Sequence, residues 1–255
     1  MSAAQSRFEG KVVAITGGGM GIGRTYGRRF AAEGASIVVA DLDPDVGERE
    51  AKELEAQGAQ AVSVAMDVSD EAGAAAMVEV ATHAFGGIDI LVNNAGIHLE
   101  HAQLPFTVEA LPKWRRVLDV NVIGALNCSA ACRPSMKARG GGAIINQSTM
   151  AAYLGGGAYS VSKLALNTLT VGLAADFAAD GIRVNGIAPS LVDSEAAMAS
   201  MAPAAQQGVI AGQMIKRLGT MEDLANMALF LCSDDASFVT GQTILVDGGF
   251  VKKAW

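Results

Sequence analysis

Cysteine is scarce in this chain, and basic side chains are outnumbered by acidic ones. The 255 residues include three cysteines, Cys128, Cys132 and Cys232, and their spacing matches no common metal-binding pattern. So sparse a set is typical of a protein in a reducing cytosol. The formal net charge of −7 argues against a nucleic-acid-binding protein, because phosphate binding needs a basic face.

Long apolar runs are also missing. No stretch reaches the roughly 18 consecutive apolar residues of a membrane-spanning helix, and the start "MSAAQSRFEGK" has no apolar segment typical of a signal peptide. We therefore expect a cytoplasmic protein. The hydrophobic fraction of 51%, with 18% charged residues, is ample for a packed core.

Short runs rich in Val and Ile recur along the chain. They are continuous rather than alternating, as expected of strands buried on both faces, and lie at residues 11–16, 36–40, 61–66, 88–93, 143–147, 182–187 and 243–246. Helix-length segments with amphipathic spacing, such as 44–57, separate them. This alternation predicts a single α/β domain, a doubly wound parallel sheet with helices on both faces.

Residues 194–215 are longer than a tight connection between a strand and a helix requires. We interpret this segment, rich in Ala, Met and Gln, as a lid over a ligand. A surface helical hairpin is the alternative interpretation.

The first strand is followed by a glycine-rich turn, "TGGGMGIGR". Its glycines follow the pattern G-x-x-x-G-x-G, at Gly17, Gly21 and Gly23, which suits a tight turn that brings a helix N-terminus to a pyrophosphate. Asp41 ends the second strand, where a carboxylate accepts both ribose hydroxyls and repels a 2′-phosphate. The pattern favours NAD(H) over NADP(H), with a purely structural turn as the alternative.

A tyrosine and a lysine stand four positions apart in "YSVSK", as Tyr159 and Lys163. On a helix this spacing places both side chains on one face. Taken alone, such a pair is more often a tyrosine that caps a core and a solvated lysine.

Several motifs together resemble the short-chain dehydrogenase/reductase superfamily over essentially the whole chain. They are "TGGGMGIG", Asp67–Val68, "NNAG" (93–96), Asn121 in "DVNVIGA", "YSVSK", "NGIAP" (185–189) and "LVDGGF" (245–250). The resemblance implies a seven-stranded Rossmann sheet and an oxidoreductase that interconverts a secondary alcohol and a ketone. It also implies the catalytic set Asn121, Thr149, Tyr159 and Lys163.

The resemblance further implies a role for each of these residues. Tyr159 is the general acid/base, and Lys163 lowers the phenol pKa by roughly 1–3 units, helped by the positive nicotinamide ring, while it also binds the nicotinamide ribose. Asn121 holds a water. Relatives have Asn-x-Ser-Ser where this chain has "NQST", so we expect Thr149, rather than Ser148, to orient the substrate oxygen.

The glycine turn and the resemblance together define the expected coenzyme site. Ser190 and Ser194 replace a glycine and a threonine of the usual pattern, and Ser194 is expected at the carboxamide. The expected coenzyme residues are Gly17, Gly19, Met20, Gly21, Ile22, Gly23, Asp41, Leu42, Asp67, Val68, Asn94, Ala95, Gly96, Tyr159, Lys163, Pro189, Val192 and Ser194.

The expected substrate pocket is apolar, with Met150, Tyr153, Leu154 and Leu191. It favours a cyclic, aromatic or steroid-like alcohol. A 3-hydroxyacyl or 3-oxoacyl thioester enzyme is the first alternative, and an NAD(H)-binding scaffold without catalysis is an alternative of another class.

Two further features concern metals and partners. His98, Glu100 and His101 follow "NNAG" in a loop, and nothing in the sequence supplies a convergent ligand set with constrained geometry, so no metal is expected. The predicted helices 112–138 and 159–179 are apolar on more than one face, and the corresponding helices of the resembling family form subunit interfaces. We expect a homotetramer, with a dimer as the alternative, and no nucleic-acid or membrane partner.

Overall fold

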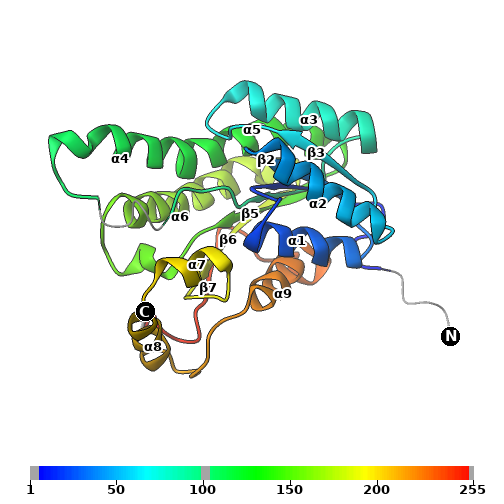
Figure 1. The fold of residues 1–255 in the computed structure, drawn as a ribbon. Coiled ribbons are helices and arrows are strands. Elements are labelled where there is room, and N and C mark those ends of the chain that lie inside the picture. Colours follow the sequence, from blue (N-terminus) through cyan, green and yellow to red (C-terminus); the bar gives the residue numbers. More distant parts are fainter. Residues whose placement is uncertain (1–5, 99–103, 253–255) are drawn as a thin grey trace.

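Seven parallel strands form one sheet in the computed structural model, which describes residues 6–98 and 104–252 (Figure 1). The strand order β3-β2-β1-β4-β5-β6-β7 confirms the predicted doubly wound α/β fold. The strands are β1 (Val12–Thr16), β2 (Ser36–Asp41), β3 (Ala61–Ala65), β4 (Ile90–Asn93), β5 (Gly142–Gln147), β6 (Ile182–Pro189) and β7 (Thr243–Val246).

Helices cover both faces of the sheet, which explains the continuous apolar runs. Along β1, Val13 and Ile15 pack into one core cluster and Val12 and Ala14 into the other, because successive side chains point to opposite faces. The helices are α1 (Gly21–Ala32), α2 (Pro44–Ala56), α3 (Glu71–Phe85), α4 (Leu111–Leu118), α5 (Gly124–Ala138), α6 (Ala158–Phe177), α7 (Glu195–Ser200), α8 (Pro203–Gly212) and α9 (Met221–Cys232).

Each face of the sheet has its own core cluster, formed with a different set of helices. Helices α1, α2 and α9 contribute buried residues to the first cluster, and α3, α5 and α6 to the second. Cys128 and Cys132 are buried in the second cluster, as small core residues. No helix among residues 6–98 and 104–252 is long and apolar enough to cross a membrane.

The predicted helix 112–138 is interrupted at its middle, which corrects the sequence-based expectation of one continuous helix. A π-helical turn, η3 (Asp119–Ile123), separates α4 from α5. A π turn closes i→i+5 hydrogen bonds and accommodates one extra residue, so it changes the direction of the side chains within it. Asn121 lies at the centre of this turn.

Candidate active site

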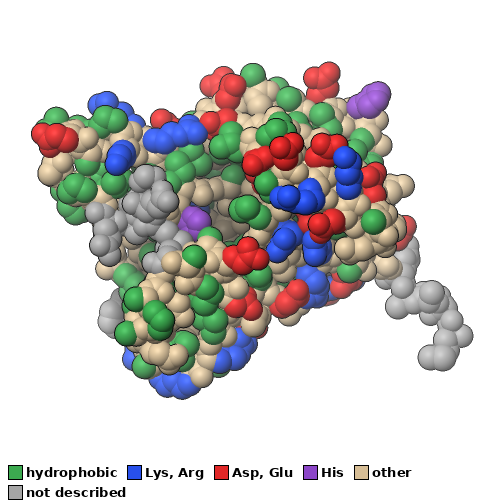
Figure 2. All heavy atoms as spheres, viewed as in Figure 1, with side chains coloured by type: hydrophobic (Ala, Val, Ile, Leu, Met, Phe, Trp, Pro, Cys, Tyr) green, Lys and Arg blue, Asp and Glu red, His purple; other side chains and the backbone are tan. Residues whose placement is uncertain are grey.

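The expected site lies where the strand order reverses, at the carboxyl ends of β1 and β4, which is where ligands bind in open parallel sheets. Figure 2 shows this face of the molecule hollowed near its centre. The glycine turn follows β1, with Gly17 at φ +61° and Gly21 at φ +54°, a region that favours glycine. A Cβ on Gly23 would lie 2.1 Å from the Gly17 carbonyl oxygen, so this close approach excludes any side chain.

The "NNAG" segment braces this turn. Asn94 Nδ2 donates to the carbonyl oxygens of Thr16 and Gly17, each at 3.0 Å, and the backbone amides of Asn94 and Ala95 both donate to Thr16 Oγ1 at 3.1 Å. The side chain of Asn94, expected among the coenzyme residues, thus shapes the glycine turn itself.

Asp41 lies against the glycine turn from the end of β2. Its Oδ2 accepts from the Gly19 amide at 3.0 Å, and its Oδ1 accepts from the Asp43 amide at 3.2 Å. A carboxylate oxygen offers two acceptor positions, so the group retains acceptor capacity. The neighbouring side chains of Leu42 and Met20 are exposed.

Asp67 follows β3 and is held by two partners. Its carboxylate accepts from the backbone amide and hydroxyl of Ser69, and from Arg116 of α4 at 2.7 Å. The Ser69 hydroxyl and then the Arg116 guanidinium lower the pKa of Asp67 to about 2. Sequence reasoning missed Arg116, which carries no local signal because it lies 49 residues from Asp67. Val68 is buried against Gly124.

Tyr159 and Lys163 lie on the first turns of α6. The Lys163 side chain is buried, and its Nζ donates to the Gln147 carbonyl oxygen at 2.6 Å and lies 6.0 Å from the centroid of the Tyr159 ring. A Cβ on Gly96 would lie 3.4 Å from Lys163 Nζ and 3.2 Å from Asn121 Oδ1. The structure therefore brings together four expected site residues, namely Tyr159, Lys163, Asn121 and Gly96.

The two candidate hydroxyls after β5 point to different partners. Thr149 shares a side-chain hydrogen bond with Tyr159. Ser148 Oγ instead donates to Asn167 Oδ1 at 2.6 Å and is buried. Of the two, the Thr149 hydroxyl is the one that lies beside the phenol.

Both the nitrogen and the oxygen of the Asn121 side-chain amide form hydrogen bonds within the fold. Its Nδ2 donates to Ser162 Oγ at 2.9 Å and to the Ile97 carbonyl at 3.0 Å, and its Oδ1 accepts from the Ile97 amide at 2.7 Å. Asn121 thus ties the interrupted helix to the segment after β4 and to α6.

Burial is the largest influence on the pKa values of both Tyr159 and Lys163. It raises the pKa of Tyr159 to about 12, against a smaller lowering by the hydrogen bond with Thr149, and it lowers the pKa of Lys163 to about 8. In the chain alone burial thus raises the phenol pKa, and the lowering expected from Lys163 together with a bound nicotinamide ring stays a prediction. The physical reason is that each group loses hydration on burial, which disfavours the phenolate of Tyr159 and the ammonium of Lys163 alike.

The remaining expected residues line the carboxyl end of β6. Pro189 is the last residue of that strand, and Val192 forms an isolated bridge with Gly219. The Ser194 hydroxyl caps α7 by accepting from the Ala197 amide at 3.3 Å.

The sequence predicts no metal site at His98. Its ring lies 6.5 Å from that of Tyr159, centroid to centroid. Among the described residues no three His, Cys, Asp or Glu side chains gather as metal ligands. Glu100 and His101 lie outside the described residues.

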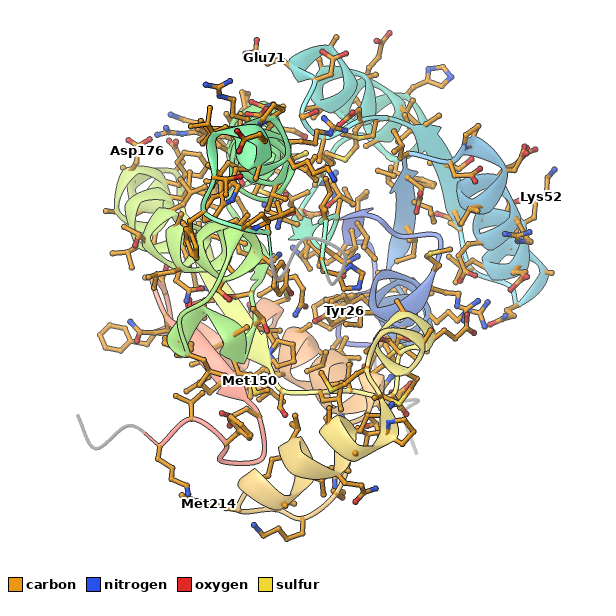
Figure 3. The ribbon with its side chains drawn as sticks, turned by 60° about the vertical axis from the view of Figure 1, so that its left-hand side comes forward. Tyr26, Lys52, Glu71, Met150, Asp176 and Met214 are labelled. Carbon is orange, nitrogen blue, oxygen red and sulfur yellow. The ribbon has the colours of Figure 1, made fainter. Side chains whose placement is uncertain are left out.

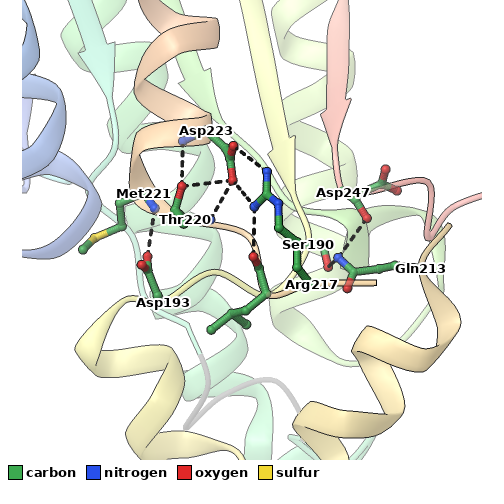
Figure 4. A network of polar contacts seen from close by, with 9 residues as sticks. Ser190, Asp193, Gln213, Arg217, Thr220, Met221, Asp223 and Asp247 are labelled. Atoms are coloured by element: carbon green, nitrogen blue, oxygen red, sulfur yellow. Dashed lines mark hydrogen bonds and ion pairs between the residues drawn. The ribbon is translucent and has the colours of Figure 1, made fainter. Parts of the chain in front are cut away.

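The segment that carries α7 and α8 is tied down at both ends (Figure 4). Gln213 Nε2 donates to Ser190 Oγ and to the Asp247 carbonyl, each at 3.2 Å, while Asp193 accepts from the Met221 amide at 2.9 Å. The two short helices between these ends are mostly exposed or half-buried.

The fold and these groups define a Rossmann-fold oxidoreductase. Residues 17–251 match a family model described as enoyl-(acyl carrier protein) reductase. An uncharacterized oxidoreductase of Mycobacterium tuberculosis is 43% identical over 247 residues, which cover 97% of this chain and 100% of that one. The 7alpha-hydroxysteroid dehydrogenase of Escherichia coli is 37% identical over 250 residues, covering 97% and 96%.

A solved structure is also similar, that of a 7α-hydroxysteroid dehydrogenase complexed with NADH and 7-oxo glycochenodeoxycholic acid. It superposes with a TM-score of 0.91 at 35% identity and covers 99% of each chain. The chain therefore belongs to the short-chain dehydrogenase/reductase family, as its motifs predict, and is an enzyme that acts on CH–OH groups.

Proposed function

We propose that this chain interconverts a cyclic secondary alcohol and its ketone, with Tyr159 as general acid/base. The observation that carries the proposal is the assembly of Thr149, Tyr159 and Lys163 beside the glycine turn, with the Thr149 hydroxyl bonded to the phenol. The arrangement suits proton transfer at an oxygen next to a bound dinucleotide.

The coenzyme is NAD(H), as the sequence predicts. The fit is supported by the tight glycine turn, in which Gly23 lies directly against the Gly17 carbonyl, and by the acceptor capacity of Asp41 beside Gly19. When bound, NAD⁺ supplies the hydride acceptor. Asp41 would accept from the ribose hydroxyls, and its charge would repel the 2′-phosphate of NADP⁺.

Thr149, Tyr159 and Lys163 have different roles in the proposed reaction. Thr149 orients the substrate oxygen next to Tyr159, whose phenolate form takes the hydroxyl proton in oxidation and whose phenol form returns it in reduction. With its pKa near 12, the phenol is protonated at neutral pH and is therefore ready as the acid for ketone reduction. Lys163 is the adjoining cation, and its ammonium form predominates below about pH 8.

The substrate class is argued from the side chains expected around the pocket. Leu191 is buried, Tyr153 is half-buried, and Leu154 has 55% of its surface exposed. These apolar side chains suit an alicyclic or steroid-like alcohol, in line with the bile-acid derivative named for the similar solved structure. We further propose that residues 194–215 form the lid, because anchored ends and exposed helices suit a cover over the substrate.

The test supplies NAD⁺ and a panel of cyclic secondary alcohols, including 7α-hydroxysteroids, and follows the absorbance of NADH. Turnover is expected, and Tyr159→Phe should lower kcat by about 10²–10⁴-fold while NADH binding is kept. If NAD⁺ binds but no alcohol is oxidised, the chain is a coenzyme-binding scaffold instead.

The family description favours a second candidate, a reductase of acyl-carrier thioesters. A phosphopantetheine carrier is acidic and would need free basic groups near the lid. Lys216 Nζ donates to the Ala211 and Gln213 carbonyls, and Arg217 pairs with Asp223 at 2.7 Å. Because the fold itself engages both cations, the small-alcohol proposal is favoured, and assay of a 3-oxoacyl thioester distinguishes the two.

We also propose the homotetramer, with a dimer as the alternative. Exposed apolar side chains on η3, α5 and α6 support it, namely Ile123, Leu126, Val161, Leu164 and Val171. Burying such a patch favours self-association. Light scattering of the purified protein measures the assembly, and a monomer would contradict the proposal.

A further inference from the structure

Tyr26 is a buried phenol outside the set of residues placed at the site so far. It lies on α1, the helix that begins in the glycine turn, and points into the interior of the molecule (Figure 3). Its side chain is 0% exposed, and burial raises its pKa far above the ordinary value. The phenol is therefore always neutral, and it donates a hydrogen bond to Gln147 Oε1.

Gln147 connects two layers of the molecule. Its Nε2 donates to the Ser148 and Ile187 carbonyls, at 3.3 and 3.5 Å, and its own carbonyl accepts from Lys163 Nζ at 2.6 Å. Its side chain therefore reaches the α1 side of the sheet, while its carbonyl holds a side chain of α6. The preceding Asn146 bonds to α6 instead, because strand side chains alternate between faces.

The hydrogen bond between Tyr26 and Gln147 affects the site because of where Gln147 lies in its strand. Gln147 is the last residue of β5, and the chain then leaves the sheet toward Thr149. The orientation of the Gln147 peptide therefore sets both the acceptor of Lys163 and the start of the segment that presents the Thr149 hydroxyl. On the β6 side the Ser148 amide still donates to the Ile187 carbonyl at 2.8 Å, but the pairing with β4 ends at Asn146, so the fixed Gln147 side chain adds a restraint to this peptide.

We propose that Tyr26 and Gln147 are positioning residues for Lys163 and Thr149, acting through the carboxyl end of β5. The inference rests on the proposed function, in which Thr149, Tyr159 and Lys163 carry the chemistry. Neither positioning residue touches the substrate. Their hydrogen bond connects the helix of the glycine turn to the ammonium at the reacting centre.

The test compares Tyr26→Phe, Gln147→Met and the double variant with Phe30→Leu as the control. Phe30 is one turn further along α1, is equally buried and packs against Phe8. Tyr26→Phe leaves a buried acceptor unpaired and lowers the melting temperature. Replacing both partners by apolar groups of similar shape removes that penalty, so the double variant should melt above Tyr26→Phe and below the wild type only by the two long Nε2 hydrogen bonds that it also loses.

The kinetic result separates positioning from stability. We expect kcat to stay about 10-fold low in the double variant, as displacement of a reacting group costs such factors, with KM for the alcohol and NADH affinity nearly unchanged. The control should melt lower with unchanged kcat. Recovery of kcat together with the melting temperature, or an equal loss of kcat in Phe30→Leu, would overturn the proposal.

A second readout does not need turnover. The ¹³Cε resonance of Lys163, assigned by its loss in Lys163→Arg, reports the pKa of the ammonium, which the wild type should show near 8. Tyr159 is the titratable group that faces it, and it stays neutral over this range because its pKa is about 12.

The double variant should lower the Lys163 pKa by about half a unit, since the displaced carbonyl favours the charged form. An unchanged pKa refutes the positioning role. Absence of turnover in the wild type would refute the proposed function alone, and the titration would still decide the inference.

Discussion

Lys163 carries a charge in the interior at a cost to stability, so its removal should stabilise the protein while abolishing activity. Burial lowers its pKa from 10.5 to about 8, a difference that corresponds to about 3 kcal/mol. Lys163→Met removes this cost. It also leaves the Gln147 carbonyl without its donor, which lowers the stability by about 1 kcal/mol. The net gain at pH 7 is about 2 kcal/mol, or a melting temperature about 4–8 °C higher for a chain of this size.

The dependence on pH has a definite sign. Because the folded-state pKa lies below the unfolded one, the unfolded chain binds more protons between pH 8 and 10.5, and the wild type gains stability as the pH rises through this window. The penalty is fully present below pH 8. The advantage of Lys163→Met should therefore shrink between pH 7 and pH 10.

Differential scanning fluorimetry across this range measures both effects. Two variants serve as controls: Lys163→Arg, which keeps a charge and should gain no stability, and Lys52→Met, which removes an exposed charge and one i,i+4 ion pair with Glu48 and should change stability by less than about 0.5 kcal/mol. A Lys163→Met protein that melts below the wild type at pH 7, or whose advantage is the same at pH 10, would refute the reasoning.

Three further predictions concern the hydroxyl, the coenzyme and the turn. Thr149→Ala should lower kcat by about 10-fold or more, and Ser148→Ala by much less, in steady-state assays of alcohol oxidation; the reverse order would mean that Ser148 reaches the substrate. Asp41→Ala should raise kcat/KM for NADP⁺ relative to NAD⁺ by about 10-fold, equivalent to 1.4 kcal/mol of lost charge repulsion, and an unchanged ratio would place Asp41 away from the ribose. Gly23→Ala adds a Cβ 2.1 Å from a carbonyl oxygen and should weaken NADH binding by more than about 10-fold in fluorescence titrations, whereas Gly172→Ala, which meets no atom within 4 Å, should leave it unchanged.

The sequence alone was sufficient to predict the placement of Tyr159, Lys163 and the glycine turn. The i,i+4 spacing placed Tyr159 and Lys163 on one helix face, and the glycine pattern after β1 predicted a turn that only glycine can form. These are local properties of neighbouring residues. The choice of Thr149 over Ser148 follows from the resemblance of "NQST" to the family motif, to which the structure adds the partner of each hydroxyl.

The departures arose from contacts between distant segments. The π turn at Asn121 interrupts a stretch whose periodicity predicts one helix, and Arg116 reaches Asp67 across 49 positions. In the chain alone burial raises the phenol pKa, because desolvation depends on what packs around a group rather than on which residue is four positions away.

The sequence by itself determined the parallel sheet, the glycine turn and the tyrosine–lysine pair, since hydrophobic period, backbone freedom and helical spacing are written in adjacent residues. Only the tertiary structure decided which atoms those groups face. The backbone carbonyl of Gln147 accepts from Lys163 and its side chain accepts from Tyr26. Both contacts form because the strand end and the two helices on opposite faces of the sheet meet there after folding.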